Sequence, residues 1–191
     1  MTLSRRYDDA LLFAHQQHRA HTRKKTSIPY IAHPLAVSSL VLEYGGGEDE
    51  AIAALLHDTL EDVGRHLEPD IEYLFGARVL EMVRECSDEV IEADEKGDPW
   101  VVRKQRYLEE IPTKSACDKL HNLTAIVRGH QAIGDEIWTR FSGKKTGTRW
   151  YYENLGDRLV ALRLAPAAAL ELKLREIDWR PLRYDPPEIS L

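Results

Sequence analysis

The chain has 191 residues, of which 43% are hydrophobic, and it carries a formal net charge of −6 with a pI near 5.8. This size and apolar content fit one globular domain with its own core. The acidic balance argues against a nucleic-acid-binding protein, whose affinity would need a broad basic surface. No run approaches the ~20 apolar residues of a membrane span, and the amino terminus lacks the apolar region of a signal peptide.

The hydrophobic pattern predicts an all-α fold, because apolar residues recur at helical spacing and glycine, proline or polar links separate the helical segments. Acidic residues 48–50 follow three glycines and suit the positive end of the next helix. We expect a loop at 94–99 and an ordinary linker at 142–147. The predicted helical segments are Tyr7–His18, Pro34–Glu43, Ala51–Val63, Pro69–Phe75, Arg78–Cys86, Ser87–Glu92, Val101–Ile111, Lys114–Gly129, Ile133–Phe141, Arg149–Leu164 and Pro166–Ile177.

The most informative motif is His57-Asp58, followed four residues later by Glu61-Asp62 within the predicted helix Ala51–Val63. Positions four apart share a helix face, so His57 would stack with Glu61 and Asp58 with Asp62. A divalent metal is the simplest counter-charge for such a cluster. The alternative is a solvated acidic face, which the dipeptide alone does not exclude.

Two other segments supply candidate ligands for the same ion. His33 precedes Pro34, which suits the first position of a helix, so the His33 ring is free to point elsewhere. The second segment is Cys-Asp-Lys-Leu-His-Asn-Leu, whose apolar residues follow helical spacing. Asp118 lies on the polar face of this predicted helix, next to its apolar face. A set of two imidazoles and two carboxylates without a thiolate suits Mn²⁺, although Fe²⁺, Co²⁺ or Zn²⁺ would bind the same groups.

These motifs carry a family resemblance as a set. His-x-x-x-x-Arg-Lys precedes Pro-Tyr-Ile-x-His-Pro, and His-Asp-Thr-Leu-Glu-Asp and Asp-Lys-Leu-His-Asn follow. The series resembles the HD-domain phosphohydrolases, and in particular the hydrolase domain of RelA/SpoT-type alarmone enzymes and the small alarmone hydrolases of the metazoan SpoT-homologue type. The resemblance implies a single HD-domain helical bundle over residues 1–191, with a motif core at about 18–128, C-terminal helices at 133–177 and the metal site between helices.

The resemblance also implies the activity and the residues that perform it. The expected reaction is Mn²⁺-dependent removal of the 3′-pyrophosphate from guanosine tetra- or pentaphosphate, which yields GDP or GTP and ends an alarmone signal of the stringent response. The chain is too short for an added synthetase domain. In the family pattern, the matching positions are assigned by role: metal ligands His33, His57, Asp58 and Asp118; proton-handling acids Glu61 and Asp62; nucleotide-binding residues Arg23, Lys24 and Asn122.

The sequence departs from the family pattern in the loop that reads the nucleotide. His21 stands where glutamine is common and Lys25 where glycine is common, so an adenosine alarmone or NADPH remains an alternative substrate. A binding protein that senses an alarmone without cleaving it is the alternative from another class. We assign structural roles to the remaining histidines, His15, His18, His66, His121 and His130.

The sequence gives a few expectations about the protein's surroundings. Cys86 and Cys117 are too few and too badly spaced for a disulfide framework, which favours a reducing cytoplasm. The expected partner is a small nucleotide, with neither nucleic acid nor membrane involved.

Overall fold

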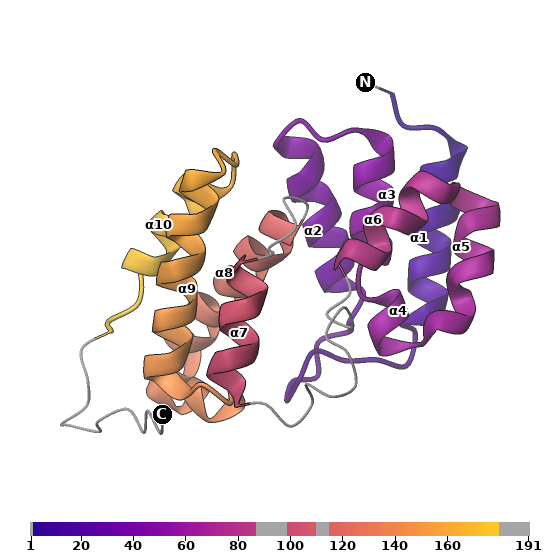
Figure 1. Ribbon diagram of the computed structural model, residues 1–191. Helices are drawn as coiled ribbons and strands as arrows, with labels where there is room; N and C mark the ends of the chain where they lie inside the picture. The colour runs from indigo at the N-terminus through magenta and orange to yellow at the C-terminus, as the bar shows by residue number, and fades with distance from the viewer. Residues whose placement is uncertain (1, 87–98, 110–114, 180–191) are drawn as a thin grey trace. The chain divides into compact units, whose positions relative to one another are not determined.

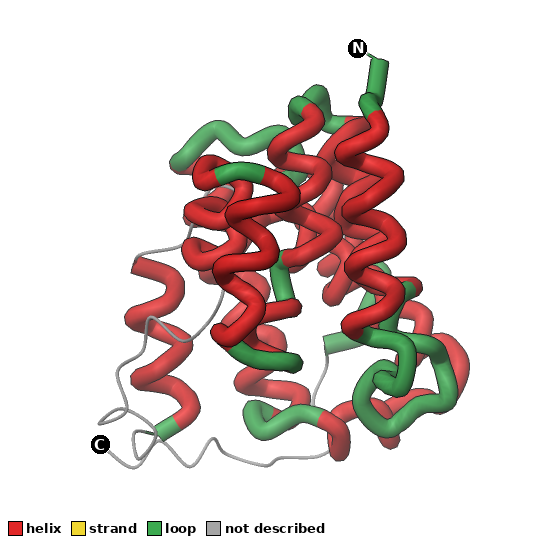
Figure 2. Tube along the Cα trace, turned by 90° about the vertical axis from the view of Figure 1, so that its right-hand side faces the viewer, coloured by secondary structure: helices red, strands yellow, loops and turns green. Residues whose placement is uncertain are grey.

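The computed structural model describes residues 2–86, 99–109 and 115–179 of the chain. Within these ranges the regular structure is helical, apart from an isolated bridge between Thr22 and Pro29 (Figure 2). The predicted all-α fold is therefore confirmed. The chain divides into two compact units, Met1–Lys96 with Lys114–His121, and Gly97–Thr113 with Asn122–Leu191. That the whole chain acts as one domain stays a prediction.

The first unit is a group of short helices around a buried central helix. Its elements are α1 (Arg5–Gln17), α2 (Ala32–Glu43), α3 (Glu48–Leu56), α4 (Thr59–Asp62), a 3-10 helix (Arg65–Leu67), α5 (Glu68–Phe75), α6 (Ala77–Cys86) and the first residues of α8 (Ala116–Ile133). Helix α3 packs against α1, α2 and α6 (Figure 1). Every residue from Ala51 to Leu56 is buried, because this segment is apolar all round and has neighbours on several sides.

The acidic start of α3 contacts two arginines of the same unit. Glu50 caps the first turn by accepting a 3.0 Å hydrogen bond from the Gly47 N–H. Arg6 pairs with Asp49 at 2.9 Å, and Arg78 pairs with Glu50 at 2.9 Å. Such partly exposed pairs contribute only ~0.2–1 kcal/mol each. Their position confirms that the acidic run marks the beginning of this helix.

The predicted helix Ala51–Val63 is interrupted at His57 and Asp58. Helix α3 ends one residue before this pair, and α4 begins one residue after it. The His57 Nδ1–H donates to the Ala54 carbonyl oxygen at 2.8 Å. A side chain that bonds a carbonyl of the preceding turn competes with the backbone bond that would continue the helix. The next helix then begins from Asp58, whose carbonyl oxygen accepts a 2.8 Å hydrogen bond from the Asp62 N–H.

The second unit packs around an aromatic and leucine-rich core. Its elements are α7 (Trp100–Glu109), the rest of α8, a 3-10 helix (Gly134–Arg140), α9 (Lys144–Ala161) and α10 (Ala167–Arg175). Helix α9 packs against α7, α10 and the 3-10 helix. The large side chains buried in it include Trp138, Tyr151, Tyr152, Leu155, Leu159 and Leu170.

The predicted linker at 142–147 is wrong, because α9 already begins at Lys144. A Cβ atom on Gly143 or Gly147 would lie 2.7 or 3.0 Å from the Trp100 ring. The two glycines therefore allow the ring to approach the backbone closely, a role of glycine that the sequence does not distinguish from flexibility.

The other predicted helices are present with shifted ends, and the segment Ile133–Phe141 is a 3-10 helix over most of its length. The predicted helical continuation Ser87–Glu92 and nearly all of the predicted loop at 94–99 lie outside the described residues. Within the described part of the chain, no helix combines the length and the apolar content that crossing a membrane requires.

Candidate metal centre

Four side chains that are far apart in the sequence converge in the first unit. His33 lies in the first turn of α2, and Asp118 lies in the first turn of α8. The Nε2 atom of His33 is 3.2 Å from Nε2 of His57 and 3.4 Å from Oδ2 of Asp58. It is also 3.1 Å from Oδ1 of Asp118. The structure thus brings the four predicted ligands together, while their binding of an ion stays a prediction.

Hydrogen bonds at the other ring nitrogens orient both imidazoles. The Nδ1–H of His57 donates to the Ala54 carbonyl oxygen, which leaves Nε2 facing the cluster. The Nδ1 atom of His33 lies 2.7 Å from Nδ1 of His121, one of which donates to the other. Metal-binding histidines are commonly held in this way, with the second nitrogen fixed by a partner outside the ligand set.

Each carboxylate of the cluster also has a partner that fixes it. The Tyr30 hydroxyl donates a 2.5 Å hydrogen bond to Oδ2 of Asp58. The Lys119 ammonium lies 2.8 Å from Oδ2 of Asp118, on the oxygen that does not face His33. Burial first, and then the Asp58 charge, raise the pKa of Tyr30, so its hydroxyl remains a donor. The cluster is therefore held by contacts on both sides.

Burial and charge oppose each other in this cluster. Burial lowers the pKa of His57, but the Asp58 and Asp118 carboxylates outweigh it and raise that pKa to about 9. Burial raises the pKa of Asp58, yet the imidazoles of His57 and His33 hold it well below its usual range. For Asp118, Lys119 and the same imidazoles outweigh burial and lower the pKa. The surroundings therefore stabilise a positive charge between the two carboxylates. A divalent cation would supply such a charge.

The distances and donor types fit a divalent ion. Donors bound to one ion at ~2.1 Å lie ~3 Å apart when they meet at right angles. His57 Nε2 is 2.9 Å from Oδ2 of Asp58 and 3.8 Å from Oδ1 of Asp118, so these atoms need only small shifts to share an ion. Within the described residues, His33, His57 and Asp58 form a group whose donor atoms all lie within 4.8 Å of one another.

The two acids predicted to handle protons lie on α4 and are exposed. Oδ2 of Asp62 is 4.0 Å from Nδ1 of His18, at the end of α1. Asp62 therefore faces a histidine outside the four predicted ligands. The proton-handling role of Glu61 and Asp62 stays a prediction.

The predicted nucleotide-binding pair lies in a closed loop between α1 and α2. One closing bond runs from the Tyr30 N–H to the His21 carbonyl oxygen at 2.9 Å. The Arg23 guanidinium lies 5.7 Å from the centre of the Tyr30 ring, and Lys24 is exposed. The loop therefore connects Arg23, through Tyr30, to the carboxylate of Asp58.

Asn122 follows His121 on α8 and is the first residue of the second unit in that helix. It is half-buried. Its contact with a nucleotide, like those of Arg23 and Lys24, stays a prediction.

Sequence reasoning missed three residues that support the cluster, namely Tyr30, Lys119 and His121. Each stands inside a motif that was used for its neighbours, and Tyr30 lies three residues before His33 in Pro-Tyr-Ile-Ala-His. The spacing of the motif gave no reason to connect Tyr30 with Asp58, because their contact exists only in the folded chain.

Comparisons with known proteins show the family of the chain. The HD domain family model matches residues 10–113. The human guanosine-3′,5′-bis(diphosphate) 3′-pyrophosphohydrolase is 35% identical over 130 residues, which cover 63% of this chain and 69% of that protein. The Drosophila melanogaster protein of the same name is 33% identical over 185 residues, which cover 91% of this chain and 93% of the relative.

Solved structures extend the similarity to the fold. The structure of a metazoan ortholog of SpoT, described as hydrolysing ppGpp and acting in starvation responses, matches with a TM-score of 0.65 and 27% identity. The match covers 92% of this chain and 95% of that one. A Listeria monocytogenes protein shares the fold with a TM-score of 0.61 at 22% identity, over 75% of this chain and 96% of its own.

Proposed function

We propose that this chain, which belongs to the HD-domain family, is a metal-dependent hydrolase that removes the 3′-pyrophosphate from guanosine tetra- or pentaphosphate. The products would be GDP or GTP and pyrophosphate. The observation that carries the proposal is the convergence of two imidazoles and two carboxylates at 2.9–3.8 Å. Similarity to proteins named for this reaction supports the choice of substrate.

We assign the metal to His33, His57, Asp58 and Asp118, and we propose Mn²⁺ as the ion. The donor set of nitrogen and oxygen without sulfur supports this choice. When bound, such an ion acidifies a water molecule and neutralises phosphate charge. His33 and His57 would present Nε2 to the ion, because their Nδ1 atoms are occupied by other partners.

The other predicted site residues bind the substrate and move protons. Glu61 and Asp62 would exchange protons with the attacking water or the leaving group. Arg23 and Lys24 supply cations for phosphate or base, and Arg23 already lies against the Tyr30 ring. Asn122 would donate or accept a hydrogen bond from the nucleotide.

The reaction is tested by incubating Mn²⁺-loaded protein with guanosine tetraphosphate and measuring pyrophosphate and GDP. Asp118→Asn should abolish turnover by weakening metal binding. Glu61→Gln and Asp62→Asn should retain the ion held by His33, His57, Asp58 and Asp118 and lose at least ~100-fold in kcat. Asp70→Asn, an exposed acid on α5, is the matched control and should remain active. Near-normal rates in both α4 variants would remove the proton-handling assignment.

The base preference is tested in the same assay with an adenosine alarmone and NADPH beside the guanosine nucleotide. His21 and Lys25 in the loop keep these alternatives open. Faster cleavage of either would reassign the substrate within the same reaction class. The metal-loaded protein could also bind guanosine tetraphosphate and release no pyrophosphate. That result would favour the alternative of a binding protein that senses an alarmone without cleaving it.

We also place this activity in the cytoplasm and in a single domain formed by the whole chain. Both cysteines are free, and burial raises the pKa of Cys86 to about 12. A cell fractionation that recovered the protein outside the cytoplasm would contradict the location. Separate unfolding transitions for the two compact units would contradict the single domain.

A further inference from the structure

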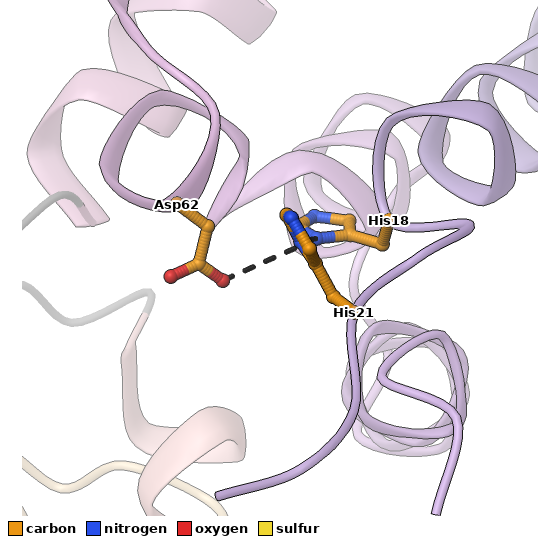
Figure 3. A group of neighbouring side chains, drawn as sticks. All are labelled: His18, His21 and Asp62. Carbon is orange, nitrogen blue, oxygen red and sulfur yellow. Dashed lines mark hydrogen bonds and ion pairs between the residues drawn. The ribbon is translucent and has the colours of Figure 1, made fainter.

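A second group of possible metal ligands lies beside the first one. His18 is the C-cap residue that directly follows α1, His21 lies in the loop after it, and Asp62 is the last residue of α4. One donor atom from each side chain lies within 4.8 Å of the other two. Figure 3 shows the Asp62 carboxylate pointing towards the two imidazole rings. None of these three residues belongs to the four ligands proposed above.

The donor atoms of the three side chains lie close together. The two Nδ1 atoms of His18 and His21 are 3.2 Å apart, and Oδ2 of Asp62 is 4.0 Å from the first of them. The His18 side chain is fully buried, and its Nδ1 atom, which approaches both His21 and Asp62, is the nitrogen that an ion between the three side chains would meet.

The surroundings favour the form of His18 that can bind a metal. Burial outweighs the nearby Asp62 and Asp58 charges and lowers the pKa of His18, so its ring is neutral and keeps a lone pair. Tyr30 stacks on His18 with ring centres 4.8 Å apart, and its edge-on contact with His21 spans 6.3 Å. These aromatic contacts hold both imidazoles in place.

We propose that His18, His21 and Asp62 form a second cation site, distinct from the first. Two imidazoles and one carboxylate suit a transition ion such as Zn²⁺ and not Mg²⁺ or Ca²⁺, which prefer oxygen. Zn²⁺ donors at ~2.0–2.1 Å lie ~3–3.5 Å apart, which the imidazole pair already satisfies. The exposed Asp62 carboxylate needs only a small movement to complete the set. Water would fill the fourth position.

The site is tested by equilibrium dialysis against Zn²⁺, followed by elemental analysis of metal per chain. The wild-type protein should bind two equivalents, and His21→Gln should bind one. His15→Gln removes an exposed histidine from the same helix end and should still bind two. Equal binding by wild type, His21→Gln and His15→Gln would overturn the second site, as would one equivalent in the wild type.

A variant of the first site distinguishes metal binding at the two sites. Asp118→Asn should keep one Zn²⁺, which the double variant Asp118→Asn/His21→Gln should lose. If Asp118→Asn still binds two ions, the first assignment fails, and the second is still judged by His21→Gln. Nitrogen NMR of the imidazoles gives an independent readout: in the wild-type protein, excess Zn²⁺ should shift the His18 and His21 ring nitrogens. Unshifted signals in the wild type would contradict the proposal even if a variant folds poorly.

Discussion

The Tyr30 hydroxyl donates to the same Asp58 oxygen, Oδ2, that lies 2.9 Å from Nε2 of His57. This bond fixes the direction of a proposed ligand from a different segment of the chain. Tyr30→Phe should therefore weaken Mn²⁺ binding ~10-fold, within the usual range for the loss of such a supporting contact. Isothermal titration calorimetry measures the change. Tyr73→Phe, an 89% exposed tyrosine, is the control, and equal affinities in the two variants would show that the bond has no such role.

Removal of metal should lower the stability of the protein. An ion that binds only the folded chain adds about 2.7 kcal/mol to the free energy of unfolding when it is present at 100 times its Kd. Urea denaturation with a chelator and then with excess Mn²⁺ measures this difference. In Asp118→Asn the effect of Mn²⁺ should be much smaller, because a ligand is lost. The same stabilisation in both proteins would place the ion elsewhere.

The stability of the metal-free protein should fall as the pH rises above neutrality. Folding raises the pKa of His57 from 6.5 to about 9, so its contribution is complete below pH 6.5 and is lost as the pH rises through 9. The expected loss is about 1–3 kcal/mol. Urea denaturation from pH 6 to 9.5 measures it, and His57→Gln should lack this component. Parallel profiles for the two proteins would contradict the stabilised imidazolium.

The glycines of the second unit should differ in their response to alanine. Gly143→Ala places a Cβ atom 2.7 Å from the Trp100 ring, and overpacking of this kind costs about 1–3 kcal/mol. Gly156→Ala within α9 meets Leu170 at an ordinary 3.5 Å and should gain about 0.5–1 kcal/mol from helix propensity. Thermal unfolding of both variants tests the contrast. If Gly156→Ala were destabilised and Gly143→Ala were unaffected, the packing described here would be contradicted.

The helical pattern and the order of the motifs were enough to predict the all-α fold and to select four residues that meet in space. They could not reveal the break between α3 and α4, because it depends on a bond from the His57 side chain to a backbone carbonyl. They also gave His18 and His121 structural roles only. His18 approaches Asp62, and His121 approaches His33, through contacts that only the folded chain makes.

The linker prediction failed for a related reason. Glycine and lysine in a short run indicate a flexible connection when neighbours in the sequence are the only guide. Trp100 approaches Gly143 and Gly147 from another helix, and this packing requires the absence of a side chain. Long-range packing therefore determined the secondary structure of this segment, which local propensity predicted wrongly.

The loop between α1 and α2 ends at Tyr30, whose backbone N–H closes the loop and whose hydroxyl reaches Asp58. A molecule that moved Tyr30 on binding this loop would displace a group bonded to a candidate ligand. By thermodynamic reciprocity, an ion that fixes Asp58 would then change the affinity of the loop for that molecule by the same factor. The Tyr30 ring would in that case couple the occupancy of the loop to the occupancy of the cluster.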